Sequence, residues 1–170
     1  RLWSEPTPAG SCVRKILLFG NSASGKSTLA TRLAQELQVV HLDLDSLAWL
    51  PTQPPRRRPL EETTIAINEF TGNNASWIVE GCYTDLLEVL EQRTGELIFL
   101  MLPIEQCLQN ARNRPWEPHK YESKEAQDSN LAMLLEWIAA YENRDDVFSL
   151  AAHRAFYERF PGKKTCILSN

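Results

Sequence analysis

One eight-residue stretch near the start of the chain constrains its fold more than any other feature. Residues 20–27 read GNSASGKS and match the spacing G-x-x-x-x-G-K-[ST] at every fixed position. An apolar run over residues 13–19 precedes this stretch, and Leu29, Leu33 and Leu37 follow it at helical spacing. A strand, a glycine-rich turn and a helix in this order make a P-loop, in which backbone N–H groups and the positive helix end surround a phosphate. The pattern therefore predicts a nucleotide-binding turn.

Two side chains of this P-loop have specific expected roles. Lys26 is expected to reach the β- and γ-phosphates of a bound nucleotide, and the Ser27 hydroxyl is expected to bind Mg²⁺. We therefore expect ATP and Mg²⁺ as cofactors. The expected nucleotide contacts come from the whole turn and the start of the helix, namely Gly20, Asn21, Ser22, Ala23, Ser24, Gly25, Lys26, Ser27 and Thr28.

Strands and helices alternate along the rest of the chain. Further apolar runs predict strands over residues 39–44, 76–79, 96–102 and 164–168. Helical patterns lie between them over residues 60–70, 84–93, 103–112 and 130–160, the last with a break near 143–146. This alternation predicts an α/β fold of the three-layer P-loop NTPase type, a five-stranded parallel sheet with helices on both faces. We expect a tail over residues 1–12 and a single domain over residues 13–170.

Composition narrows the function further. Hydrophobic residues make up 43% of the chain and charged residues 24%, which is typical of a globular domain. The net charge of -4 argues against a general nucleic-acid binder. The four cysteines form no C-x-x-C pair, which predicts free thiols in a reducing cytosol and no zinc site. No apolar run approaches the ~18 residues of a membrane span, so we expect a cytoplasmic protein that does not use a membrane.

Carboxylates end two of the predicted strands. Asp43 and Asp45 close the second strand, and Glu80 closes the third. Because residues two apart in a strand point the same way, a strand that continued to its end would turn both aspartates to one side. Ligands of parallel sheets bind beyond the carboxyl ends of the strands. We therefore expect Ser27, Asp43 and Glu80 to hold Mg²⁺, and Asp45 to orient or deprotonate a phosphoryl acceptor. Solvated strand-end carboxylates are the alternative.

A polar loop with arginines at its start predicts a lid. Residues 113–128 contain two prolines and no helical period, which predicts a mobile loop, and the lid as a whole is expected over residues 111–128. Arg112 and Arg114 are candidate catalytic residues, because a closing arginine stabilises the charge on a transferred phosphoryl group. The alternative is that they cap a helix C-terminus. Further candidates for phosphate contacts are His119, Lys120 and Arg144.

The segment after the second strand is expected to bind the acceptor, over about residues 46–75. Within it, Arg56–Arg58 either hold an anionic acceptor or form a solvated basic turn between prolines. Trp49 and Tyr83 either stack on a ring-shaped acceptor or pack as ordinary aromatics. The pattern does not identify the acceptor beyond a small molecule.

These motifs together resemble the nucleoside-monophosphate kinase and shikimate kinase superfamily. Within it, the stretches 44–49 (LDSLAW) and 77–83 (WIVEGCY) are similar to the adenylate-kinase-like ATPases known as topology modulation proteins. The resemblance implies a five-stranded parallel sheet, an acceptor-binding segment after the second strand and an arginine-bearing lid. It also implies a kinase that moves the γ-phosphoryl group of ATP to a small-molecule acceptor with Mg²⁺. Of the glycine triplet of shikimate kinases, only Gly81 is present.

Two other functions stay open at this point. A polynucleotide 5′-kinase would use Arg56–Arg58 along a nucleic-acid backbone, although the acidic net charge disfavours nucleic acid as a partner. A nucleotide-binding regulator would bind ATP tightly and turn over little of it. Translation-type GTPases and transporter ATPases are disfavoured, because the chain has neither an N-K-x-D nor an L-S-G-G-Q motif.

Overall fold

Five parallel strands form the central sheet of the computed structural model, which describes residues 12–170. The strands are β1 (Lys15–Gly20), β2 (Val40–Asp43), β5 (Trp77–Gly81), β6 (Glu96–Leu100) and β7 (Lys163–Ile167). Their order across the sheet is β2-β5-β1-β6-β7, and every neighbouring pair is parallel. The predicted five-stranded parallel sheet is therefore confirmed. The predicted tail, except Cys12, lies outside the described residues.

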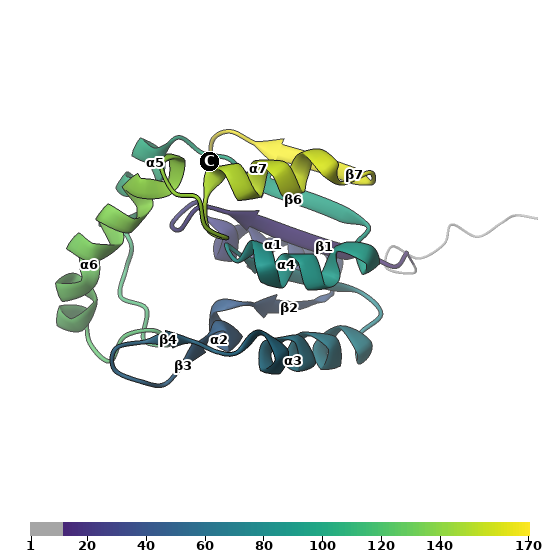
Figure 1. Ribbon diagram of the computed structural model, residues 1–170, viewed down its shortest axis with the longest axis horizontal. Coiled ribbons are helices and arrows are strands. Elements are labelled where there is room, and N and C mark those ends of the chain that lie inside the picture. The colour runs from purple at the N-terminus through teal and green to yellow at the C-terminus, as the bar shows by residue number, and fades with distance from the viewer. Residues whose placement is uncertain (1–11) are drawn as a thin grey trace, which may run out of the picture.

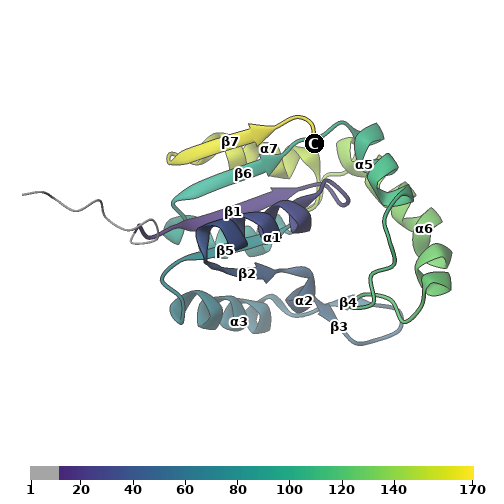
Figure 2. The same cartoon turned by 180° about the vertical axis from the view of Figure 1, so that it is seen from behind.

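Helices cover both faces of this sheet, as Figures 1 and 2 show from opposite sides. Helix α1 (Lys26–Leu37) packs on one face, whereas α3 (Leu60–Gly72), α4 (Thr84–Leu90) and α7 (Leu150–Arg159) pack on the other. In β1, Leu17 and Phe19 belong to one core cluster, and Ile16 and Leu18 belong to the cluster under α1. Because alternate side chains enter opposite cores, the central strands are largely apolar. The predicted three-layer α/β architecture is confirmed.

Two smaller units lie beyond the carboxyl ends of the strands, toward which the arrowheads point in both views (Figure 1). One is the pair of helices α5 (Ile104–Arg112) and α6 (Lys124–Ala139), which share an apolar cluster with Ala23 of the P-loop. The other consists of α2 (Asp45–Ala48) and the antiparallel strands β3 (Trp49–Leu50) and β4 (Arg56–Arg57). Short 3₁₀ turns follow α4 and α6, namely η1 (Glu91–Arg93) and η2 (Ala140–Glu142). The α5–α6 pair and the unit made of α2, β3 and β4 together flank the end of the sheet where the P-loop lies.

The prediction that one strand carries both aspartates was wrong. Strand β2 ends at Asp43, and α2 begins at Asp45. The carboxylate Oδ1 of Asp43 accepts the backbone N–H of Asp45 at 2.9 Å, and the Ser46 hydroxyl donates to the carbonyl oxygen of Asp43 at 2.6 Å. An aspartate that accepts a backbone N–H two residues ahead forms a turn, which stops the strand. The two carboxylates still reach one cavity, but from different elements.

The predicted loop over residues 113–128 is also too long, because α6 begins at Lys124. The Ser123 side chain accepts the backbone N–H of Ala126 at 3.0 Å and so caps the helix. The first turn of α6 is polar and shows no apolar period, which hid the helix start. The connection between α5 and α6 therefore covers residues 113–123.

The described residues also bear on two compositional predictions. The four cysteines are free; Cys82 and Cys107 are buried and Cys166 is half-buried, whereas Cys12 is exposed. Across residues 12–170, no helix is both long and apolar enough to cross a membrane.

Candidate functional site

The P-loop forms an open cradle between β1 and α1. A Cβ atom at Gly20 would lie 2.4 Å from the carbonyl oxygen of Leu100, so only glycine fits where β1 ends. Gly25 has φ 91° and is the N-cap residue of α1, a left-handed conformation that glycine adopts without strain. No side chain caps this helix, and its first turn holds no acidic residue. Its first N–H groups are therefore available to an anion, and the cradle fits a phosphate.

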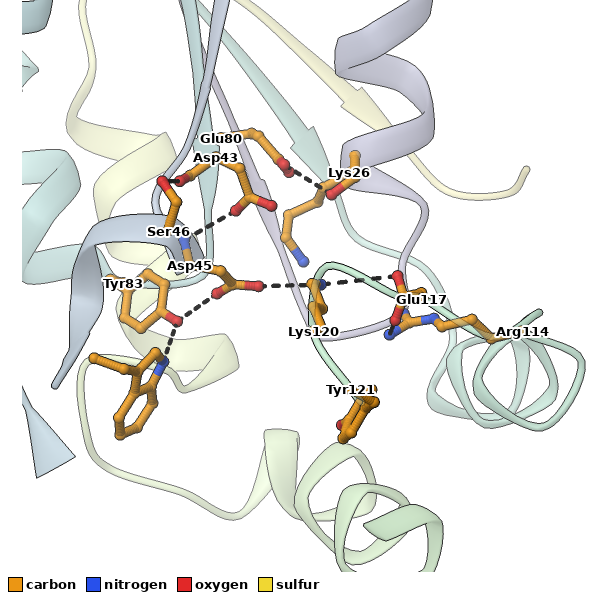
Figure 3. Close-up of polar contacts among 12 residues, drawn as sticks. Lys26, Asp43, Asp45, Ser46, Glu80, Tyr83, Arg114, Glu117, Lys120 and Tyr121 are labelled. Carbon is orange, nitrogen blue, oxygen red and sulfur yellow. Dashed lines mark hydrogen bonds and ion pairs between the residues drawn. The ribbon is translucent and has the colours of Figure 1, made fainter. Parts of the chain in front are cut away.

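A cavity of ≈ 350 Å³ opens directly in front of this cradle. Lys26 and Ser27 line it from the P-loop, Asp43 and Glu80 from strands β2 and β5, and Asp45 from the start of α2. The Lys26 ammonium donates to the carbonyl oxygen of Asn21 at 2.6 Å, so it already lies over the turn. Figure 3 shows this lysine and the three carboxylates pointing toward one another. The structure thus brings the principal predicted site residues together.

The other P-loop residues divide into two groups. Those that line the cavity are Ser22, Ala23, Gly25 and Thr28, in addition to Lys26 and Ser27. Those that do not line it are buried in the turn behind, namely Gly20, Asn21 and Ser24. Contacts from this second group to a nucleotide would come through their backbone.

Two helices beyond the sheet are hydrogen-bonded to the P-loop itself. The Asn21 side chain donates to the carbonyl oxygen of Ile138 in α6 at 3.2 Å. Asn110 of α5 donates to the carbonyl oxygen of Ala23 at 2.9 Å. The base of the α5–α6 pair is thereby anchored on the phosphate cradle. Sequence reasoning missed this link, because the partners lie at least 87 residues apart.

Asp43 and Glu80 form a pair of neighbouring carboxylates beside Ser27. They are register partners on β2 and β5, and the Ser27 hydroxyl donates to Oε1 of Glu80 at 2.7 Å. The Glu80 side chain is 1% exposed, and His41 Nε2 lies 3.4 Å from the same oxygen. Burial, followed by the charges of Glu80 and Asp45, raises the pKa of Asp43 to about 6.

The side-chain oxygens of Ser27, Asp43 and Glu80 suit a magnesium ion that also binds a phosphate. They suit less well a metal ion bound by protein atoms alone. Mg²⁺ is bound in proteins by one or two carboxylates together with phosphate oxygens and water. Ser27, Asp43 and Glu80 supply such oxygens next to the phosphate cradle. Residues 12–170 contain no group of three or more His, Cys, Asp or Glu residues that could hold a metal ion. The donor set therefore fits Mg²⁺ only in company with a phosphate.

Asp45 is held by a chain of hydrogen bonds on the acceptor side. The Tyr83 hydroxyl donates to Oδ1 of Asp45, and the Trp49 indole N–H donates to the Tyr83 oxygen at 2.8 Å. The Lys120 ammonium lies 3.4 Å from Oδ2 (Figure 3). Burial alone would raise the pKa of Asp45, but Lys120, Tyr83 and Lys26 together outweigh it and lower that pKa. Asp45 is thus a fixed, ionised carboxylate.

Tyr83 has a different place from the stacking role considered for it. Its side chain is only 2% exposed and lies behind Asp45, outside the lining of the cavity. The alternative, packing as an ordinary aromatic residue, agrees with this burial, and the hydroxyl is in addition hydrogen-bonded to Asp45. Sequence reasoning missed its contact with Asp45, since nothing local links residues 38 positions apart.

The arginine cluster Arg56–Arg58 lies outside the cavity lining. Arg57 donates to the Asp85 carboxylate at 3.1 Å, with its guanidinium over the Tyr83 ring. Arg58 donates to the carbonyl oxygen of Leu47 at 3.0 Å. These two arginines connect β4 and the residue after it to the rest of the domain. Their contacts are therefore structural, whereas the sequence had suggested binding of an anionic acceptor as one alternative.

The segment over residues 113–123 closes the cavity from the far side. Arg114, Glu117 and Lys120 all line it, with Arg114 3.3 Å and Lys120 3.9 Å from the Glu117 carboxylate. Arg112 is exposed at the end of α5 and does not line this cavity. Of the two predicted catalytic arginines, only Arg114 lies at the site, whereas Lys120, a further candidate, lies there as well.

A second cavity of ≈ 570 Å³ adjoins the first beside α1 and β7. Arg114 and Pro115 line both cavities, which places the two next to each other. The second cavity combines apolar with amide side chains, namely Leu29, Leu100, Ile167, Asn110, Asn113 and Asn170. Such a lining suits a flat, partly polar ring.

Comparisons with known proteins agree with this architecture. The family model described as AAA domain matches residues 16–130. The uncharacterised protein YqaC of Bacillus subtilis (strain 168) is 30% identical over 151 residues, which cover 82% of this chain and 80% of that protein. The predicted P-loop NTPase relationship is confirmed.

Among solved structures, the chain is similar to a shikimate kinase from Acinetobacter baumannii in complex with shikimate. The identity is 22% and the TM-score 0.49, over 90% of this chain and 96% of that chain. A sugar kinase from Janibacter sp. HTCC2649, unliganded, is 18% identical with a TM-score of 0.49, over 87% of this chain and 92% of that one.

Proposed function

Because this chain belongs to the AAA domain family, we propose that it is an ATP-dependent phosphotransferase that acts on a hydroxyl of a small molecule. One observation carries the proposal: a single cavity contains the P-loop lysine, a magnesium-type oxygen set and a separate fixed carboxylate. The first two features bind a nucleotide, and the third has no use in nucleotide binding alone. A carboxylate set apart in this way suits an acceptor hydroxyl.

On the donor side, the P-loop residues bind and orient the triphosphate. Lys26 turns from the Asn21 carbonyl oxygen onto the phosphates, and the N–H groups at the start of α1 bind them from below. Ser27, Asp43 and Glu80 would hold Mg²⁺, which supplies positive charge against the phosphate oxygens. The adjoining second cavity accommodates the nucleotide base.

On the acceptor side, Asp45 orients the attacking hydroxyl. The acceptor oxygen forms a bond to the γ-phosphorus as the bond from that phosphorus to the β–γ bridging oxygen breaks, and ADP leaves. The hydroxyl proton passes to Asp45 and from there to water. Because the pKa of Asp45 is lowered, the carboxylate acts first as a hydrogen-bond acceptor and takes the proton only as the new bond forms.

The lid supplies the remaining positive charge. Arg114 lines both cavities, so it lies where the nucleotide phosphates pass from one cavity to the other. We assign to Arg114, with Lys120, the stabilisation of charge on the transferred phosphoryl group. Arg112 is exposed at the end of α5 and does not line the cavity, so it has the weaker claim to the catalytic role predicted for it.

The replacement of Lys26 by alanine tests this proposal. Lys26→Ala should weaken binding of an ATP analogue with Mg²⁺ by about 10²-fold and abolish ATP consumption, because the β- and γ-phosphates lose their cation. Isothermal titration and a coupled ADP assay measure the two effects. Lys163→Ala, an exposed lysine at the start of β7, is the matched control and should change neither.

Two results would contradict the proposal. Unchanged affinity and turnover in Lys26→Ala would show that the P-loop does not bind the nucleotide. Tight ATP binding by the unaltered chain, with no phosphoryl transfer to any of a broad panel of hydroxyl compounds, would indicate a nucleotide-binding regulator instead.

A further inference from the structure

The positively charged side chains that line the cavity in front of the P-loop all contact other groups of the protein. Among the described residues these are Lys26, Arg114 and Lys120. Lys26 belongs to the phosphate cradle. Arg114 is paired with Glu117 next to the second cavity, in which we place the nucleotide base. Lys120 lies between Asp45 and Glu117, at 3.4 Å and 3.9 Å from their carboxylates. No lining cation is left over for an anionic group on the acceptor.

Two arginines of the predicted acceptor-binding segment, Arg57 and Arg58, do not supply one. Arg57 is hydrogen-bonded to Asp85 and packed between the rings of Tyr83 and Phe148. Arg58 is hydrogen-bonded to backbone carbonyl oxygens and paired with Glu62. Turning either side chain toward the cavity would break these hydrogen bonds and ion pairs and the packing of Arg57 on the two rings.

The lining of the cavity as a whole presents negative charge. Four carboxylates line the cavity against the three cations, namely Asp43, Asp45, Glu80 and Glu117. The magnesium–nucleotide complex that the donor side binds is itself anionic. A phosphate or carboxylate on the acceptor would therefore add like charge beside Asp45, whose partner Lys120 is shared with Glu117, and like charges held close together are strongly unfavourable.

The same carboxylates suit hydroxyl and amine groups. Ionised carboxylates only accept hydrogen bonds, and hydroxyl and ammonium groups donate them. Asp45 is held in place by Tyr83, so it offers a fixed acceptor. Tyr121 and Leu134 line the same cavity and provide an aromatic ring and an apolar side chain for the carbon skeleton of a ligand.

From this charge distribution we infer that the phosphoryl acceptor is a hydroxyl compound without an anionic group, either neutral or amine-bearing, such as a polyol, an amino sugar or a nucleoside. Nucleoside monophosphates, sugar phosphates, hydroxy acids and polynucleotides fall outside this class. The inference rests on the phosphotransferase function proposed above and names the substrate class of that site.

Matched pairs of acceptors test the inference with the unaltered chain. The pairs are sorbitol with gluconate, glucosamine with glucosamine 6-phosphate, and adenosine with AMP, together with a 5′-hydroxyl oligonucleotide. Transfer from γ-labelled ATP is measured for each, and mass spectrometry identifies the product. In every pair that reacts, we expect kcat/KM of the neutral or amine-bearing member to be higher by on the order of 10²-fold.

The outcomes separate this inference from the proposed function. Transfer that favours the anionic members, shows no preference, or occurs only to the oligonucleotide would overturn the inference while the phosphotransferase function stands. If ATP binds and no compound is phosphorylated, both are overturned.

A charge-neutral variant adds a second readout. Asp45→Asn removes one cavity carboxylate and frees Lys120, so the preference within a reacting pair should shrink to below about tenfold. Asp128→Asn, at an exposed aspartate paired with Lys124 outside the cavity, is the control and should keep the full preference. An unchanged preference in Asp45→Asn would show that Asp45 does not select the acceptor.

Discussion

Asp43 and Asp45 are two positions apart, and yet their pKa values move in opposite directions. Burial beside Glu80 raises the pKa of Asp43, whereas Lys120, Tyr83 and Lys26 together lower that of Asp45. The difference arises because one side chain faces another carboxylate and the other faces cations. At the residue scale, this contrast supports the different roles that we propose for the two aspartates.

We therefore expect different defects from the two matched variants. Asp45→Asn should lower kcat with an acceptor by about 10²-fold or more, the scale of a positioned proton acceptor, and should nearly spare slow ATP hydrolysis. Asp43→Asn should impair both reactions and raise the Mg²⁺ concentration required. Rates measured against Mg²⁺, with and without acceptor, distinguish the variants. Identical defects would rule out the division of labour and leave a shared metal site.

Local spacing predicts some residues of the site and misses others. The P-loop and the strand-end carboxylates could be found because the residues that define each motif are neighbours in the sequence, as Gly25, Lys26 and Ser27 are. Tyr83 and Lys120 could not be assigned in this way, because their partner Asp45 lies 38 and 75 residues away. Only the folded chain brings such pairs together.

At the scale of elements, the segment over residues 113–123 is short and yet well connected. The Glu117 N–H donates to the Gln127 side chain at 2.8 Å, and Gln127 in turn donates to the carbonyl oxygen of Pro115 at 3.1 Å. Asn130 donates to the Tyr121 hydroxyl at 2.9 Å. These bonds tie the segment over residues 113–123 to α6, so any movement of the segment as a lid would depend on contacts that α6 provides.

We expect this lid segment to gain protection from hydrogen exchange when donor and acceptor analogues bind together. It buries little apolar surface of its own, so its amides should exchange faster than those of α6 in the free protein. Gln127→Ala should speed exchange over residues 113–123 alone, because it removes two of the lid contacts. Lys124→Ala, a neighbouring exposed residue of α6, serves as the control. Equal protection with and without ligands would exclude a lid that responds to them.

Element type was easier to predict than element boundaries. The three central strands were found because burial on both faces makes them short, largely apolar runs, as in residues 15–20 and 96–100. The two-residue strands β3 and β4 and the four-residue helix α2 are too short to show a period. Their formation depends on tertiary contacts such as the hydrogen bond from Trp49 to Tyr83.

At the scale of the whole molecule, one buried histidine connects three parts of the core. His153 of α7 is fully buried, with Nε2 2.8 Å from the carbonyl oxygen of Cys82 and Nδ1 2.7 Å from the Tyr141 hydroxyl. Because a carbonyl oxygen can only accept, Nε2 carries the proton and Tyr141 donates to Nδ1. Burial lowers the pKa of His153 to about 4, against an ordinary value of 6.5. The native protein therefore keeps this side chain neutral.

This neutral histidine should make stability depend on pH in a defined window. The unfolded chain binds a proton at His153 below pH 6.5, whereas the folded chain does so only near pH 4, so the free energy of unfolding falls as pH drops between these values. By pH 5 the loss should be about 2 kcal/mol. Urea unfolding at pH 7 and pH 5 measures it. His153→Gln should remove this part of the difference, and the exposed His119→Gln should not. An equal pH difference in the wild type and in His153→Gln would disprove the assignment.

The hydrogen bonds from Asn21 and Asn110 to α6 and the P-loop have a thermodynamic consequence. They make the phosphate cradle and the base of the α5–α6 pair a common support, so any displacement of the helices is felt in the loop that binds the nucleotide. A coupling free energy between two sites acts equally in both directions. If a bound nucleotide favours the closed lid by a given factor, the closed lid must raise nucleotide affinity by the same factor, whichever substrate binds first.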